Sequence, residues 1–140
     1  VMHRYGWTYG VIYIDIDEFE RINEMHGRTI GNDVLKMIAK TLQNSVRATD
    51  VVGRWEDDAF MVIAANVNED QLNHIANKIR ALVEQSGFPV GADVIRVTAS
   101  VCATIVRSND TVATLFERID KLMEHDKVFR KKHVLLKMAV

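Results

Sequence analysis

The chain has 140 residues, of which 48% are hydrophobic and 26% are charged, and its formal net charge is −1 at pH 7. This composition excludes an intrinsically disordered chain, and the balanced charge gives no general reason to bind DNA or an anionic membrane. The length suits one globular domain spanning 1–140. A single cysteine, Cys102, cannot form a disulfide within the chain, which favours a reducing, cytoplasmic location.

The first half of the chain predicts a strand, two helices and a hairpin. The apolar run Val11–Ile14 is typical of a buried strand. A short helix from Glu18 to Met25 follows, and a longer one from about Asn32 to Val46 shows apolar side chains at helical spacing. Two further strands, Val51–Trp55 and Phe60–Ala64, are separated by four residues that predict a hairpin tip.

The second half predicts a helix from Leu72 to Val83, a strand from Val94 to Val106, a helix around Val112–Glu124 and a last strand near His133–Met138. The central hairpin argues against an all-parallel sheet, so we expect an antiparallel or mixed sheet with helices packed on it.

Two acidic residues fall at the ends of predicted strands. Asp15 ends the first strand, and Asp58 lies in the hairpin tip. If the hairpin packs beside the first strand, both carboxylates can bind one hard divalent cation such as magnesium. Acidic residues are also common solvated turn formers, and spacing alone favours that interpretation.

The run Ile14–Asn23, with Gly27 and Gly31 after it, resembles the opening of a GGDEF domain. This is the diguanylate cyclase family, which condenses two GTP into cyclic di-GMP. Arg54–Phe60 corresponds to the family signature Arg-Tyr-Gly-Gly-Asp/Glu-Glu-Phe, and Val97–Val101 resembles its Val-Thr-x-Ser-Ile strand. The resemblance implies an α+β fold, with a mostly antiparallel five-stranded sheet of ferredoxin-like palm topology flanked by helices. It also implies a domain excised from a larger bacterial signalling protein.

The signature departs from the family pattern at its catalytic positions, and none of the catalytic set is intact. It reads Glu56, Asp57, Asp58, Ala59 and Phe60. Ala59 replaces the glutamate that supports the reacting centre, and a methyl group can neither bind metal nor accept a proton. Glu56 and Asp57 replace glycines and add bulk and negative charge beside a triphosphate. The magnesium positions implied by the resemblance are Asp15, Ile16 and Asp58.

The vestigial nucleotide contacts that the resemblance implies are Asn23, Asn32, Lys127 and Lys131. Asn32 stands where the family has an aspartate that accepts both guanine N–H groups. An amide has one acceptor oxygen, so one guanine donor loses its partner at a cost of roughly 1–3 kcal/mol. Lys131 replaces an arginine and keeps the charge without the planar fork.

An inhibitory Arg-x-x-Asp motif of the family, which binds cyclic di-GMP, has a counterpart in Arg47 and Asp50, at the fixed offset before the signature. An arginine can donate to guanine O6 and N7, and an aspartate can accept from N1–H and N2–H. Lys78 falls where the family often has a second contacting arginine. The alternative roles are a cation at a helix C-terminus for Arg47, a turn residue for Asp50 and a solvated helix residue for Lys78.

The sequence therefore predicts a catalytically degenerate GGDEF domain that senses cyclic di-GMP through Arg47, Asp50 and Lys78. The alternatives are a residual diguanylate cyclase and a dimerisation scaffold that binds no nucleotide. Enzyme activity stays open, with the substitutions favouring its absence. Sensing needs no cofactor, and magnesium enters only if GTP, a weaker candidate ligand, still binds. We expect an adjoining sensor or phosphodiesterase domain and a homodimer as partners, and neither nucleic acid nor direct membrane contact, although the parent protein can be membrane-anchored.

Overall fold

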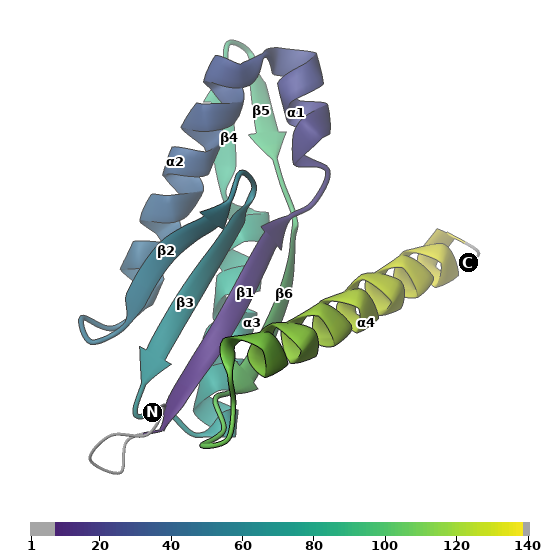
Figure 1. Ribbon diagram of the computed structural model, residues 1–140. Coiled ribbons are helices and arrows are strands. Elements are labelled where there is room, and N and C mark those ends of the chain that lie inside the picture. Colours follow the sequence, from purple (N-terminus) through teal and green to yellow (C-terminus); the bar gives the residue numbers. More distant parts are fainter. Residues whose placement is uncertain (1–7, 139–140) are drawn as a thin grey trace.

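The computed structural model of the chain describes residues 8–138, with the side chains of 8–126. An antiparallel sheet in the order β2-β3-β1-β6 forms its centre (Figure 1). Its strands are β1 (Tyr9–Ile16), β2 (Val51–Glu56), β3 (Ala59–Ala65) and β6 (Ala99–Ile105). The helices are α1 (Phe19–His26), α2 (Arg28–Ser45), α3 (Glu69–Gln85) and α4 (Val112–Met138). A separate hairpin consists of β4 (Gly87–Val90) and β5 (Asp93–Arg96).

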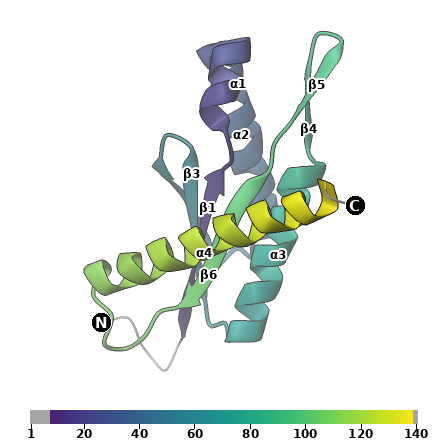
Figure 2. The same ribbon diagram turned by 90° about the vertical axis from the view of Figure 1, so that its right-hand side faces the viewer.

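The central strand β1 is apolar on both faces because helices cover both faces of the sheet. Ile12 and Ile14 have no exposed surface and pack with the apolar faces of α2 and α3. Val11 points to the opposite face and packs with Leu115 and Ile119 of α4. Figure 2 shows α4 crossing β6 on the side of the sheet away from α3. A strand buried on both faces reads as a continuous apolar run, which is why it is visible in the sequence.

The α+β class and the antiparallel sheet are confirmed, but two details of the expected strands are wrong. Within residues 8–138 the central sheet has four strands, not five. The predicted last strand, His133–Met138, belongs to α4 instead. No glycine or proline interrupts α4, and its last residues are strong helix formers, so the apolar run continues the helix.

The predicted strand Val94–Val106 is also wrong as a single element. It consists of β5 and β6, separated at Val97–Thr98, where the Thr98 carbonyl accepts a hydrogen bond from the Asp17 N–H at 2.9 Å. The strand β4 lies where the sequence predicts only the end of a helix. Figure 2 shows the β4–β5 hairpin extending beyond the sheet on the side of α1.

The other boundaries differ from the prediction by a few residues. The helix α2 begins at Arg28, directly after Gly27 with φ of 88°, so Asn32 lies one turn inside the helix. No helix among the described residues is long and apolar enough to cross a membrane.

Candidate functional site

The tip of the β2–β3 hairpin lies beside the carboxyl end of β1, as the sequence predicts. Ala59 pairs with Asp15, and the Ile16 N–H donates to the Asp58 carbonyl at 3.0 Å. The Arg54 guanidinium closes the tip by donating to the carbonyls of Glu56 (3.3 Å) and Asp57 (2.5 Å). Among the described residues other than glycine, positive φ occurs at Glu18 and Asn66 alone. Glu56 and Asp57 are therefore accommodated in the tip without a left-handed backbone.

A cleft of about 660 Å³ opens between this tip and the helices α1 and α2. Five of the predicted site residues line this cleft: Asn23, Asn32, Glu56, Asp57 and Asp58. Other residues, among them Phe19, Glu20 and Arg28, line it as well. Gly31 keeps the Asn23 amide in place, because a Cβ at Gly31 would lie 1.9 Å from Asn23 Oδ1. Asp15 and Ile16 are not among the lining residues. The structure thus brings the two amides and the acidic tip together.

Negative charge is concentrated near this tip on the face of the sheet that α4 crosses. The pKa of Tyr13 is raised to about 12, first by burial and then by the nearby carboxylates of Glu56, Asp15 and Asp58. Tyr13 follows Val11 by two residues on β1 and so shares its face. Any anionic ligand brought to this end of β1 meets the same carboxylates.

The magnesium site that the resemblance implies can be tested against these residues. Asp15 lies on β1 and Asp58 lies in the neighbouring hairpin tip, and both influence the Tyr13 hydroxyl. Within the described part of the chain, no three His, Cys, Asp or Glu side chains are placed to hold a metal ion. Magnesium is often bound by one or two carboxylates, with water and substrate phosphates completing its octahedron. The residues therefore fit a magnesium ion that arrives with a nucleotide, and they form no complete protein cage.

The second predicted site, the turn at Arg47–Asp50, is tightly organised. The Asp50 side chain has no exposed surface. Its carboxylate accepts from the Arg47 backbone N–H (3.1 Å), Arg47 Nε (3.3 Å), Arg47 Nη2 (3.2 Å) and the Ala65 N–H (3.2 Å). Arg47 Nη2 also donates to the Ala65 carbonyl at 2.5 Å, and 48% of the Arg47 side chain stays exposed. Asp50 thus fixes the arginine against the end of β3.

A cleft of about 410 Å³ lies between Arg47 and the first two turns of α3. It is lined by Arg47, Val67, Asp70, Gln71, His74 and Ile75. Asp50 does not line it, because its carboxylate lies behind the guanidinium. Lys78 is exposed and lies one helical turn beyond His74 on the same side of α3, and it is not among the residues that line the cleft. Asp70 and His74 were not predicted from the sequence. Asp70, His74 and Lys78 are four residues apart, and this spacing indicates that they share one face of the helix.

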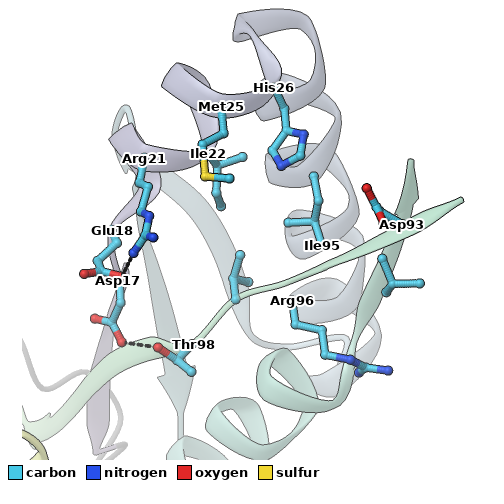
Figure 3. A pocket seen from close by; sticks show the side chains of 12 residues that line it. Asp17, Glu18, Arg21, Ile22, Met25, His26, Asp93, Ile95, Arg96 and Thr98 are labelled. Carbon is cyan, nitrogen blue, oxygen red and sulfur yellow. Dashed lines mark hydrogen bonds and ion pairs between the residues drawn. The ribbon is translucent and has the colours of Figure 1, made fainter. Parts of the chain in front are cut away.

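A third groove, of about 530 Å³, separates α1 from the β4–β5 hairpin (Figure 3). Figure 3 shows Met25 and His26 on the α1 side and Asp93 and Arg96 on the hairpin side. At its lower end the Asp17 carboxylate accepts from Thr98 Oγ1 at 2.6 Å and from Ser100 Oγ at 2.7 Å. The sequence assigns no role here, because the groove depends on the break between β5 and β6.

Lys127 and Lys131 lie in α4, and their side chains fall outside the described residues, so their role stays a prediction.

The chain matches the family model described as "Diguanylate cyclase, GGDEF domain" over residues 2–133. It is 31% identical over 128 residues to the diguanylate cyclase DgcM of Escherichia coli, covering 89% of this chain and 28% of that protein. It is 33% identical over 137 residues to the response regulator PleD of Caulobacter vibrioides, covering 96% and 30%. The diguanylate cyclase SiaD of Pseudomonas aeruginosa, solved with its activator SiaC, superposes with a TM-score of 0.84 at 27% identity, covering 90% of this chain and 48% of that one.

Proposed function

Because the chain belongs to the GGDEF domain family of diguanylate cyclases, we propose that it acts in cyclic di-GMP signalling as a receptor and not as a cyclase. The dinucleotide binds in the cleft between Arg47 and α3. The observation that carries this proposal is the Arg47 guanidinium, which is half-exposed at the cleft and held in place by a carboxylate with no exposed surface.

The bonds that hold Arg47 leave part of its guanidinium available to a ligand. A guanidinium has five N–H donors. Nε donates to Asp50, and Nη2 donates to Asp50 and to the Ala65 carbonyl. Within the described residues Nη1 has no partner, so its two N–H groups can donate to guanine O6 or N7 or to a phosphate oxygen. Asp50 acts as a positioning residue, because it fixes the arginine and does not itself reach the cleft.

The rest of the cleft suits a nucleotide with negatively charged phosphates. Val67 and Ile75 provide apolar surface against which a base can pack. Lys78, one helical turn beyond His74, supplies a second positive charge, which attracts phosphate without the geometric specificity of an arginine. Sensing at this site requires no metal ion.

The hairpin tip supports the second half of the proposal, the absence of synthesis. Ala59, which the resemblance aligns with the family's glutamate, is 1% exposed and pairs with Asp15. Glu56 and Asp57 line the cleft in which GTP would have to bind. Their charges oppose a triphosphate at short range, and the opposition grows as water is excluded.

A residual cyclase is the second candidate, and one observation favours it. Asn23, Asn32 and Asp58 still share a single cleft. In that case Asp15 and Asp58 would hold magnesium together with the phosphates of GTP. Incubation with GTP and magnesium, followed by chromatography, tests it directly: we expect no cyclic di-GMP, and a product peak would revive the cyclase.

The chain spans about 28% of the length of DgcM, so its partners in the whole protein are also proposals. A dinucleotide bound at the exposed edge of Arg47 can bridge this domain to an adjoining sensor or phosphodiesterase domain, or to a second subunit. Such a bridge shifts the equilibrium between the bridged and unbridged conformations of the whole protein, and the size of the shift is set by the difference in ligand affinity between those two conformations. We propose that the domain acts in the cytoplasm.

Calorimetric titration with cyclic di-GMP tests the receptor. We expect micromolar or tighter binding to the wild type, and at least about a tenfold loss, equivalent to 1.4 kcal/mol, in Arg47→Ala. Arg107→Ala is the matched control, because Arg107 is an exposed arginine in the loop after β6. Binding that survives Arg47→Ala would contradict the site. Absence of heat and of any thermal shift in the wild type would instead support the scaffold that binds no nucleotide.

A further inference from the structure

We propose that a cleft between α2 and β2 binds a small organic carboxylate with an apolar body. This α2–β2 cleft has a volume of about 240 Å³ and opens between the helix and the strand, which lie next to each other in Figure 1. It shares no lining residue with the cleft beside Arg47, so it is independent of the proposed receptor site.

Positive charge without a neighbouring carboxylate distinguishes the α2–β2 cleft. Lys36 and Arg54 line it, and no aspartate or glutamate does. Each of the three clefts described above has at least one carboxylate in its lining. In the part of the chain that the structure describes, neither Lys36 nor Arg54 belongs to an ion pair within 4.0 Å. An anion in this cleft is therefore attracted by two charges that no acidic group of the cleft neutralises.

The Arg54 guanidinium has donors left for such an anion. Its Nε donates to the Glu56 carbonyl at 3.3 Å, and its Nη2 donates to the Asp57 carbonyl at 2.5 Å. Among the described residues Nη1 has no partner, so its two N–H groups are available. Arg54 pairs with Phe60 across β2 and β3, and opposed residues share a face of the sheet, so the arginine lies on the face that packs against α2. A charge-assisted bond from Nη1 to a carboxylate is stronger than a bond between neutral groups.

Apolar side chains form most of the remaining surface of the cleft. Leu35 and Phe60 are each 2% exposed, and both line it. Ala39 and Val52 are half-buried and line it as well. A ligand with an apolar body removes this surface from water, which is favourable, whereas an inorganic anion leaves it hydrated. The cleft therefore favours a ligand that combines one negative charge with an apolar part.

The directions of the two elements determine how such a ligand lies. The helix α2 begins beside the hairpin tip, because Arg28 and Asn32 line the cleft there, and β2 ends at the same tip. Lys36 is thus on the tip side of the α2–β2 cleft together with Arg54, and Gln43 lies about two turns further along the helix. The carboxylate binds between the two cations, the apolar body follows the helix, and the Gln43 amide can bond to a polar group at the far end.

The volume limits the ligand to about ten non-hydrogen atoms, since pockets for drug-sized molecules usually span about 300–1,000 Å³. Cyclic di-GMP and GTP are larger than this. An alternative is that Lys36 and Arg54 are solvated surface charges beside an ordinary contact between a helix and a strand. In that case a charged and an uncharged ligand of the same shape bind equally, or neither binds.

Nuclear magnetic resonance titration of the backbone amides tests the site with three probes. The probes are 3-phenylpropionate, its uncharged analogue 3-phenylpropanol, and inorganic phosphate. Lys36→Gln removes one charge from the cleft, and Ala39→Leu fills the cleft without changing its charge. Lys40→Gln is the matched control, because Lys40 is an exposed lysine one turn further along α2 that does not line the cleft.

We expect 3-phenylpropionate to bind the wild type with a dissociation constant of about 1 mM or lower and to shift the amide of Gly53, which lines the cleft. Binding should weaken about fivefold in Lys36→Gln and at least about tenfold in Ala39→Leu, and should stay within about twofold in Lys40→Gln. The alcohol and phosphate should each bind at least about fivefold more weakly than the carboxylate. Absence of a saturable shift in the wild type, equal binding of the carboxylate and the alcohol, or equal losses in the two lysine variants would each overturn the proposal.

Discussion

Two clefts of this domain, one beside α3 and one at the hairpin tip, differ in how their charged groups are arranged. In the cleft beside α3, the Asp50 carboxylate is neutralised by Arg47 and by backbone donors, and the remaining face of the arginine points to solvent. At the hairpin tip, Glu56, Asp57 and Asp58 line one cleft, and the nearby Arg54 guanidinium is turned onto backbone carbonyls. The first arrangement is prepared for an anion and the second opposes one. This contrast supports the proposed use of the first cleft, which family membership alone does not indicate.

The Arg47 turn and the hairpin tip should also differ in how much they contribute to the stability of the fold. The prediction with the largest expected effect tests this difference. Asp50→Ala removes an acceptor with no exposed surface from four donors, including the Ala65 N–H. We expect a loss of about 1.5–3 kcal/mol in the free energy of unfolding, the range for a hydrogen bond to a charged group.

Urea denaturation of Asp50→Ala beside Asp57→Ala measures this contrast. The Asp57 side chain is exposed at the hairpin tip, and its backbone carbonyl, the group that accepts from Arg54, is retained in the variant. Its substitution should change stability by no more than about 0.5 kcal/mol. Equal losses in the two variants would mean that the Arg47 turn is no better organised than the tip.

The second prediction removes negative charge from the hairpin tip. Glu56→Gly combined with Asp57→Gly removes two carboxylates from the cleft that contains Asn23 and Asn32. We expect GTP with magnesium to bind at least about tenfold more tightly to this variant, because two like-charge contacts with the triphosphate are lost.

Affinity for cyclic di-GMP at the Arg47 cleft serves as the internal control for the double glycine variant. It should be unchanged, since the two clefts share no lining residue. Unaltered GTP binding would show that neither the charge nor the bulk of Glu56 and Asp57 limits the pocket, and would leave the Asn32 amide as the limiting substitution.

The sequence predicts the parts of the fold that depend on local apolar patterns. The run Val11–Ile14 marks β1, and the acidic segment before Phe60 marks the hairpin tip. It does not predict the short strand β4, because four residues give too little periodicity. Nor does it predict the break before β6, which involves the Asp17 N–H from the turn after β1. The error at 133–138 has another cause, since a short apolar run fits a strand and a helix equally well.

The candidate site divides in the same way. The motif spacing brings Arg47 and Asp50 together in sequence, and the structure places them in contact. The loss of all exposed surface at Asp50 could not be predicted, because it depends on Ala65 in another strand. The presence of Asp70 and His74 in the same cleft could not be predicted either, because the orientation of α3 toward the Arg47 turn is a product of packing against the sheet.

The smallest expected effect concerns the acidity of Tyr13 and reports on the tip without any ligand. Its pKa lies near 12 in the folded chain because of burial first and the charges of Glu56, Asp15 and Asp58 next. An unfolded tyrosine ionises near pH 10. The folded protein therefore retains the proton over about pH 10–12 while the unfolded chain loses it, so this group favours folding fully below pH 10 and ceases to do so as the pH rises through 12.

Glu56→Gln removes one of the charges that hold the proton on Tyr13. We expect the pKa of Tyr13, followed by the ultraviolet absorbance of tyrosinate, to fall by less than one unit and to remain above 10, since burial is the larger cause. Tyr13→Phe identifies its part of the absorbance change, which the other tyrosines would otherwise obscure. A pKa that did not move would place Glu56 too far from β1 to oppose a ligand there, and the contrast between the two clefts would then rest on Asp15 and Asp58.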